Sequence, residues 1–448
     1  MKANGEMRRD ARGMTPGRPL SHLTAAWRPL TAVVGAVLIA LAAGACSSSS
    51  STSSTASTGG TGSSAAASSP ASSTVSDASV QRLVNQAFQA GISLSSLPTT
   101  VQQAFQAAAE PLMQAQLTSA YSCWQNSTCS TGTGGSTTLG IADGFGDNTW
   151  RQFTKMEIIL QALHYKQVGK IIYTNAHGVL SQFQANIRSL AAQGVKAIVT
   201  YDDFGTAAVP AFAAAQRAGA KVSSYVGGIP NAPTIAVANQ VSANICAAGT
   251  SMADSTSTLL GGKGEVAFFN GTPGNPQGAA WNTCASQEFK AKGGGITVAY
   301  EANTNWTPAG AQQAAAGLVS TGKPVKAILY DYADPLTQVV KAFQQAGRVT
   351  PALVTWTSNN ALFGMWQQDQ GTSKAFDLYY TNGLNWESRV SVTAVLNLLA
   401  GQSVPAQLTV PMPFVKAVKG IYAASLPGTY PGPSVLVPAA LVSKMLGS

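Results

Sequence analysis

Apolar and polar positions alternate in a regular order from residue 137 to about residue 358. Short apolar runs, typical of buried parallel strands, are separated by stretches whose apolar positions have helical spacing. Strands are expected at 137–145, 170–176, 195–201, 220–226, 264–271, 296–303, 325–332 and 351–358, and the first helices at 148–165, 180–192 and 207–218. This order predicts doubly wound α/β units, which bind ligands at the carboxyl ends of their parallel strands.

A Pro/Gly-rich stretch at 227–240 divides the alternation into two similar units, so the fold class is α/β with two doubly wound lobes and a cleft between them. The length of 448 residues also exceeds what one compact core usually holds. Residues 77–122 have helical periodicity, with Val80, Val84 and Phe88 on one face. We therefore expect a helical preface and linker at 77–136, and a C-terminal tail at 431–448.

The first 45 residues have the pattern of an export signal. A basic region at 2–28 precedes an apolar run at 30–44, which is too short to span a membrane but suits the core of a signal peptide. Gly44 and Ala45 before Cys46 resemble the bacterial lipobox, although Ala43 stands where Leu is usual. This resemblance implies a lipidated Cys46 on the outer face of a bacterial cell membrane; the alternative is an ordinary cleaved signal.

The residues after Cys46 are almost entirely Ser, Thr, Gly and Ala up to residue 74. Such a composition cannot bury enough apolar area to fold, and it is typical of flexible linkers. We therefore expect residues 46–76 to form a tether between the anchor and the folded part.

Four further cysteines remain, an even number that indicates two disulfides in an exported protein. The pairs Cys123–Cys129 and Cys246–Cys284 are one arrangement, and the sequence leaves other pairings open. A metal site is the competing use of four cysteines, but their spacing is not C-x-x-C and no histidine lies nearby. We expect neither a metal nor a cofactor.

The charge pattern argues against a nucleic-acid partner. Formal net charge is +9 with only 10% charged residues, and part of the excess lies in the export segment. The folded part has no run of Lys or Arg that could neutralise several phosphates.

The stretch Gly144-Phe145-Gly146-Asp147-Asn148-Thr149-Trp150 lies between a strand and a helix, as a phosphate-binding loop would. It departs from G-x-G-x-x-G at the third glycine, and Asp147 would repel a pyrophosphate. The skeleton from Gly317 to Lys323 also fails as a phosphate loop, because Pro324 replaces the residue that would hold Mg²⁺. A nucleotide site is therefore not expected.

Catalytic motifs are also missing from the sequence. It has three histidines, no G-x-S-x-G and no H-E-x-x-H. Asp202-Asp203 is the one obvious carboxylate pair, and neighbours in sequence do not usually face one cleft together. They lie after the third strand, where they serve either as acceptors for ligand hydroxyls or as a solvated turn. We do not expect an enzyme.

Several segments resemble type I periplasmic sugar-binding proteins, the ribose- and xylose-binding components of ABC importers. They are RSLAAQGVKAIVTY (188–201), PAFAAAQRAGAKV (210–222), LLGGKGEVAFFNGTPG (259–274), VKAFQQAGRVTPALVTW (340–356) and LNLLAGQSVPAQLTVPMPFV (396–415). The resemblance covers 137 to about 416. It implies two lobes, 137–237 (completed by 384–405) and 238–383 (completed by 406–430), joined by crossings near 235–240, 380–386 and 403–410 that close on a ligand.

The resemblance also implies the site. In the first lobe, the loop residues Phe145, Asn148 and Trp150 take the place of the family's aromatic and Asn ligand contacts; the alternative for Trp150 is a buried helix residue. Aromatic faces stack on the C–H faces of a sugar, and Asn bonds to hydroxyls. The remaining candidates follow strands of the first lobe (Asp202 and Asp203) or of the second: Asn275, Trp281, Asp331, Tyr332, Trp356 and Asn359.

The sequence departs from the family at three ligand-gripping positions, where Val226-Gly227, Thr283 and Thr357 replace charged residues. This weakens the case for the usual pentoses and hexoses and predicts a site richer in aromatic and neutral side chains. We expect a small polar ligand, a sugar or polyol, that is delivered to an ABC permease in the membrane. The alternatives are a ligand-sensing receptor domain that acts on a membrane signal transducer, and a secreted enzyme.

Overall fold

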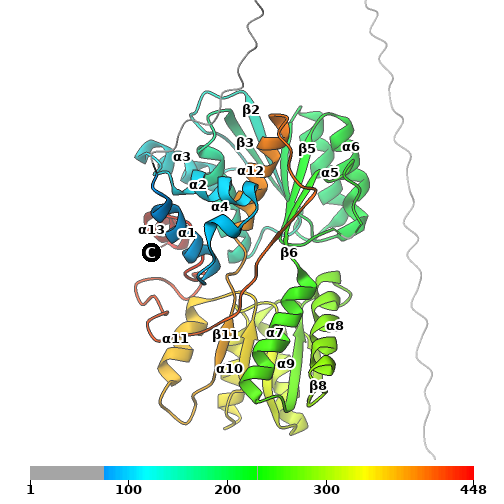
Figure 1. Ribbon diagram of the computed structural model, residues 1–448, viewed down its shortest axis with the longest axis vertical. Helices are drawn as coiled ribbons and strands as arrows, with labels where there is room; N and C mark the ends of the chain where they lie inside the picture. Colours follow the sequence, from blue (N-terminus) through cyan, green and yellow to red (C-terminus); the bar gives the residue numbers. More distant parts are fainter. Residues whose placement is uncertain (1–74, 230, 448) are drawn as a thin grey trace, which may run out of the picture. The chain divides into compact units, whose positions relative to one another are not determined.

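The computed structural model describes residues 75–229 and 231–447 (Figure 1). The predicted signal peptide, Cys46 and nearly all of the predicted tether lie outside the described residues.

The first lobe is built on a seven-stranded sheet in which every strand but one is parallel to its neighbours. Helices α4 (Thr149–Leu163) and α12 (Glu387–Leu399) cover one face, and α5 (Leu180–Ala192) and α6 (Val209–Arg217) cover the other. The strand order is β1 (Thr128–Ser130), β3 (Val168–Asn175), β2 (Thr137–Asp143), β4 (Ala197–Tyr201), β5 (Lys221–Tyr225), β6 (Asn239–Ala243) and β12 (Gln407–Val410).

The second lobe repeats this design with six strands. Helices α7 (Ile245–Leu260) and α8 (Pro276–Ala291) pack on one face, and α9 (Pro308–Thr321), α10 (Leu336–Gln345) and α11 (Asn360–Asp369) on the other. The strand order is β13 (Val415–Lys416), β11 (Leu378–Tyr380), β10 (Ala352–Thr355), β9 (Val325–Tyr330), β7 (Gly264–Asn270) and β8 (Ile296–Asn303). The predicted fold of two doubly wound α/β lobes is confirmed.

Two of the predicted crossings were set too early in the chain. Strand β6 pairs with β5 and β12 pairs with β6, so the chain leaves the first sheet only after Ala243 and again after Val410. The sequence of β6, NQVSA, has no apolar run that would mark it as a buried strand. Its residues Asn239 and Gln240 are buried all the same, because their amides form hydrogen bonds inside the protein. The Asn239 amide bonds to the Ser223 hydroxyl and to the Pro405 carbonyl at 2.8 and 2.7 Å.

The residues after β13 return to the first lobe. Residues 420–431 run along α11, where the Asn360 side chain donates to the carbonyls of Ala423 and Leu426 at 3.0 and 2.9 Å. The chain then reaches α4, and α13 (Ala439–Leu446) contacts α3 (Gln114–Gln125). The C-terminal segment therefore bonds to both lobes.

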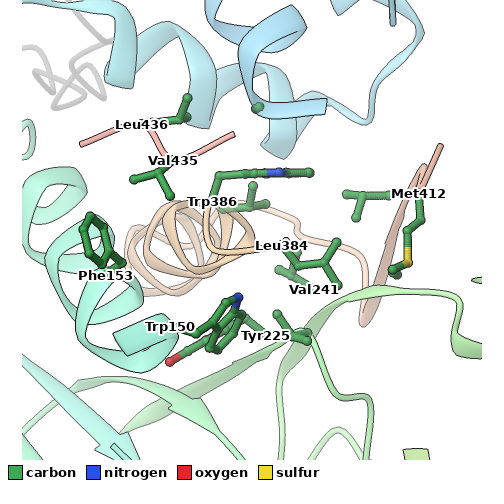
Figure 2. Packing of buried hydrophobic residues seen from close by; sticks show 14 of the residues in the cluster. Trp150, Phe153, Tyr225, Val241, Leu384, Trp386, Met412, Val435 and Leu436 are labelled. Carbon is green, nitrogen blue, oxygen red and sulfur yellow. The ribbon is translucent and has the colours of Figure 1, made fainter. Parts of the chain in front are cut away.

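The predicted helical preface consists of α1 (Asp77–Phe88), a short 3-10 turn (Leu94–Ser96), α2 (Thr99–Ala109) and α3. It packs on α4 and α12, where Phe88 and Phe105 contact Trp386 with ring centroids 4.5 and 5.5 Å away. Figure 2 shows the residues around the start of α12, with Val435 and Leu436 on one side and Trp150 and Tyr225 on the other. The disulfides join Cys123 to Cys129, beside α3, and Cys246 to Cys284, between α7 and α8.

Helix α4 is buried along almost its whole length because the preface and the C-terminal segment cover its outer face. Its polar side chains therefore bond inside the protein. Glu157 is fully buried and forms an ion pair with Arg389 of α12, which is 4% exposed. Glu157 also accepts from the Leu436 N–H at 2.6 Å, and Arg389 donates to the Leu436 carbonyl at 3.1 Å.

We predict that Glu157→Gln strongly destabilises the protein. The substitution leaves the Arg389 guanidinium buried without its carboxylate, and breaking such a pair costs about 3–5 kcal/mol. Glu288→Gln is the matched control, since Glu288 forms a surface pair with Lys292 on α8 at 3.5 Å. Urea denaturation of the two variants measures the difference, and equal midpoints would refute the prediction.

Candidate ligand-binding cleft

A cleft of about 1070 Å³ lies between the lobes, at the carboxyl ends of strands from both sheets. This volume is slightly above the range of about 300–1,000 Å³ for small-molecule sites. Its aromatic and charged lining consists of Phe145, Trp150, Arg151, Tyr201, Asp202, Asp203, Phe204, Trp306, Asp331, Tyr332 and Trp356. The amides Asn148, Asn244, Asn275, Gln277, Asn305 and Gln407 also line it.

Nine of the eleven predicted contact residues line this cleft, namely Phe145, Asn148, Trp150, Asp202, Asp203, Asn275, Asp331, Tyr332 and Trp356. Trp281 and Asn359 do not. Trp281 is fully buried behind the cleft and donates to Asp331 Oδ2 at 3.3 Å, and Asn359 caps α11 and donates to Asp334 Oδ1 at 3.1 Å. These two residues therefore position cleft residues or their neighbours.

The glycine loop after β2 serves side-chain packing. The N–H groups of Phe145 and Gly146 donate to Asp143 Oδ1 and Asn175 Oδ1 at 3.1 and 2.9 Å, so they do not point at an empty anion site. A Cβ at Gly144 would collide with the Asp203 carboxylate, and one at Gly146 with the Tyr173 hydroxyl. The two glycines are required for these close approaches, which agrees with the sequence-based argument against a phosphate loop.

Trp150 is a buried helix residue, one of the two alternatives left open by the sequence, and it also lines the cleft. It lines the cleft but is only 9% exposed, and its indole N–H donates to the Gly383 carbonyl at 2.6 Å. The Asn385 amide in turn donates to the Trp150 carbonyl at 3.0 Å. The first turn of α4 is therefore bonded to the crossing between β11 and α12.

Arg151 was missed by the sequence analysis, although it is a cation in the first turn of a helix that begins at the cleft. Asn148 caps this helix by accepting from the Arg151 N–H at 2.9 Å. The guanidinium donates to Asp143 and Asp203 at 2.7 and 2.6 Å and lies 3.3 Å from the Tyr201 ring centroid. The cleft lining contains many aromatic and amide side chains, together with Arg151 and the three carboxylates Asp202, Asp203 and Asp331.

Asp202 is a buried carboxylate at the mouth of β4. Its Oδ1 accepts from the Phe204 N–H at 2.8 Å, whereas Oδ2 has no partner among the described residues. Burial raises the pKa of Asp202 from 3.8 to about 7, and the neighbouring Asp203 carboxylate raises it while Arg151 lowers it. The side chain therefore carries a partial proton near neutral pH.

The second-lobe wall is organised around Asp331, which lies just after β9. It accepts from the indole N–H of Trp306 at 2.8 Å as well as from Trp281. Burial raises the pKa of Asp331 to about 6, and these two hydrogen bonds lower it. Trp306, which the sequence analysis also missed, lies flat against the backbone of Gly271, where a Cβ would collide with its ring.

Tyr332, which lines this wall, and its neighbour Asp334 form a second, partly buried unit. The Tyr332 hydroxyl donates to Asp334 Oδ2 at 2.7 Å, and Asn359 bonds to the other carboxylate oxygen. Burial raises the pKa of Asp334 to about 6, while these two hydrogen bonds lower it. Thr357, one of the departures from the family pattern, accepts from the Ala333 N–H at 2.7 Å and holds the same loop.

No helix within 75–229 and 231–447 is long and apolar enough to cross a membrane. Within these ranges there is also no group of three or more His, Cys, Asp or Glu side chains with the arrangement of a metal site.

Comparison with known proteins gives a clear family match. A family model described as "Periplasmic binding protein domain" matches residues 141–403, which is more than half of the chain. No curated protein sequence matches significantly.

Solved structures with the same fold include three solute-binding proteins or domains. The myo-inositol complex of an ABC transporter solute-binding protein from Bacillus halodurans C-125 has a TM-score of 0.56 at 14% identity, covering 64% of this chain and 96% of that one. An ABC transporter solute-binding protein from Thermobispora bispora DSM 43833 has 0.56 at 21%, covering 70% and 95%. The fructose-binding periplasmic domain of a hybrid two-component system has 0.54 at 16%, covering 63% and 91%.

We predict that Asp202→Asn stabilises the empty protein at high pH. Because the folded pKa is raised, the folded state keeps a proton that the unfolded chain releases, so the wild-type protein loses stability as pH rises from about 4 to about 7. The amide keeps the acceptor for Phe204 and removes the buried charge. The gain in the free energy of unfolding is on the order of 2 kcal/mol at pH 8.

Urea denaturation of wild-type and variant protein between pH 4 and 8 tests this. The difference between them shrinks as pH falls through 7 toward 4. The control is Asp377→Asn, at an exposed pair with Lys416, whose difference from wild type is small and constant. A variant that is less stable than wild type at pH 8 would contradict the argument.

Proposed function

Because the chain belongs to the periplasmic binding protein domain family, we propose that it is the extracytoplasmic solute-binding protein of an ABC importer. It holds a small polar ligand, a sugar or polyol, in the cleft between the lobes and delivers it to the membrane permease. The family is one of binding proteins and not of enzymes, so no turnover of the ligand is expected.

One observation carries the proposal: aromatic faces and amide side chains from both lobes line a single cleft. Phe145 and Trp150 come from the first lobe, and Trp306, Tyr332 and Trp356 come from the second. Aromatic rings cover the apolar faces of a sugar, and amides supply both donors and acceptors for its hydroxyls. Solute-binding proteins of this fold have been solved with such ligands, for example myo-inositol.

Ligand binding favours closure because contacts to both lobes form together only when the lobes approach. The hydrogen bonds of Trp150 and Asn385 join the first-lobe wall to the β11–α12 crossing. A ligand that packs on Trp150 therefore acts on a residue attached to the hinge. The permease would recognise the closed form.

A receptor domain that signals to a membrane transducer is the second candidate, supported by the similarity to a domain of a two-component system. The two functions differ in their partner. Cross-linking in whole cells followed by identification of the membrane partner separates them: a permease supports the importer, and a histidine kinase or similar transducer supports the receptor.

We also propose that Cys46 is lipidated and that residues 46–76 tether the folded part to the outer face of the membrane. Cells that express the full chain would incorporate a labelled fatty acid into the wild-type protein. Cys46→Ser is expected to abolish the label and release the protein from the membrane fraction. A protein that stays membrane-bound without Cys46 would overturn the anchor.

We predict that Phe145→Ala weakens ligand binding about tenfold without unfolding the protein. Phe145 is 41% exposed in the cleft, so its removal leaves little cavity, whereas the ring that covers the ligand is lost. A tenfold change corresponds to about 1.4 kcal/mol of binding free energy.

Calorimetric titration of the full chain with the sugar or polyol that gives the largest thermal shift measures this change. A ligand at about 100 times its Kd stabilises the protein by about 2.7 kcal/mol, which makes such a screen sensitive. Met113→Ala, at a residue 68% exposed outside the cleft, is the control and leaves the affinity unchanged. Equal affinities of all three proteins would place the ligand elsewhere.

A further inference from the structure

The cleft and the chain have opposite net charge. The whole chain carries a formal charge of +9. The residues that line the cleft include the carboxylates Asp202, Asp203 and Asp331 and a single cation, Arg151. With all of these groups ionised, the lining has a net charge of 1 − 3 = −2.

The one cation of the lining is already engaged. Nη1 of Arg151 donates to Asp143 and Nη2 to Asp203, and the guanidinium lies over the Tyr201 ring. Asp143 is itself 1% exposed and adds one more negative charge directly behind the wall. The ion pairs of Arg151 are therefore made with Asp143 and Asp203, and no ion pair to Asp202 or Asp331 is formed among the described residues.

Asp202 offers an unfilled acceptor to a ligand. The residue is 92% buried (8% exposed), and its Oδ2 is buried without a protein partner in the described chain. Asp203 Oδ2, which lies against Gly144, is unpartnered in the same way. A buried charged oxygen without a partner is costly, and a donor that is itself charged compensates it better than a neutral hydroxyl does.

Aromatic residues line the same cleft as these carboxylates. Tyr201 and Trp150 contact each other in the first lobe, with ring centroids 5.7 Å apart, and the indoles of Trp306 and Trp281 bond to Asp331 in the second. The faces of such rings attract cations, and carboxylates with aromatic walls are the usual environment of a bound ammonium group. Arg151 above Tyr201, at 3.3 Å from the ring centroid, is held in the same manner.

We infer that the ligand is a small polyol that carries a protonated amine, such as an amino sugar or an aminocyclitol. The amine is bound by Asp202 and the neighbouring aromatic faces, and the hydroxyls are bound by the amides Asn148, Asn275 and Gln277. This inference rests on the proposed function and specifies its ligand class. Anionic sugars are disfavoured, because the net negative lining would repel them.

Isosteric amine and neutral ligands test the inference on the full chain. Calorimetry at pH 6.5 compares D-glucosamine and D-galactosamine with D-glucose, D-galactose and N-acetyl-D-glucosamine. We expect at least one amine to bind ten times or more tightly than its neutral counterparts.

Asp202→Asn is then expected to weaken binding of that amine about ten times more than it weakens binding of the matching neutral sugar, so that the preference for the amine is lost. The control is Asp147→Asn, which removes the same charge in the same lobe, from an exposed pair with His177 that does not line the cleft. This control keeps the preference for the amine.

The possible outcomes distinguish failure of the cationic ligand from failure of the proposed solute-binding function. A neutral sugar that binds as tightly as its amine overturns the cationic ligand, and an amine preference that survives in Asp202→Asn overturns the role of Asp202 in binding it. Both results leave the solute-binding function standing. No binding of any amine or neutral sugar in the set, and no thermal shift with polyols, overturns the proposed function and this inference with it.

Discussion

The buried ion pair between Glu157 and Arg389 is the interaction on which the arrangement of the first lobe depends. It joins α4 to α12, and its remaining hydrogen bonds fix the backbone of Leu436 in the C-terminal segment. Gln161, one turn further along α4, accepts from Arg389 at 3.3 Å and donates to the Ala104 carbonyl of α2 at 3.1 Å. Removing a partner of a buried charge is strongly destabilising. These bonds therefore fix the positions of the preface, α4, α12 and the C-terminal segment relative to one another.

The same helix carries this constraint to the cleft. Glu157 lies in the middle of α4 and Gln161 near its end, Trp150 and Arg151 lie in its first turn, and the helix is buried between them. The first turn is also bonded to Gly383 and Asn385 at the crossing. Helix α4 therefore presents the Trp150 and Arg151 side chains to the cleft while being bonded to the crossing at its first turn and to α12 further along.

Much of this could be predicted from the sequence. The lobes, most strands and the ends of β4 and β9 follow from apolar runs, so Asp202 and Asp331 could be placed at the cleft. Strand β6 could not be predicted in this way, because its buried residues Asn239 and Gln240 are held by amide hydrogen bonds instead of apolar packing. From the sequence, Arg151 would be expected to be an exposed helix residue. Only the fold brings Asp143 and Asp203 beside it. Trp306 belongs to a loop whose position depends on the bare backbone of Gly271.

Because carboxylates lie in both walls, closure of the empty cleft differs in energy from closure on a ligand. Asp202 and Asp203 belong to the first lobe and Asp331 to the second, so closure without a ligand would bring like charges together in a medium of low dielectric. Burial raises the pKa of each of these three carboxylates, so their charges are already costly in this cleft. A ligand that supplies hydrogen-bond donors or positive charge between the walls removes this cost, and only then do the contacts to both lobes outweigh it. The charges that make the empty cleft unfavourable to close thus couple closure to the presence of the ligand.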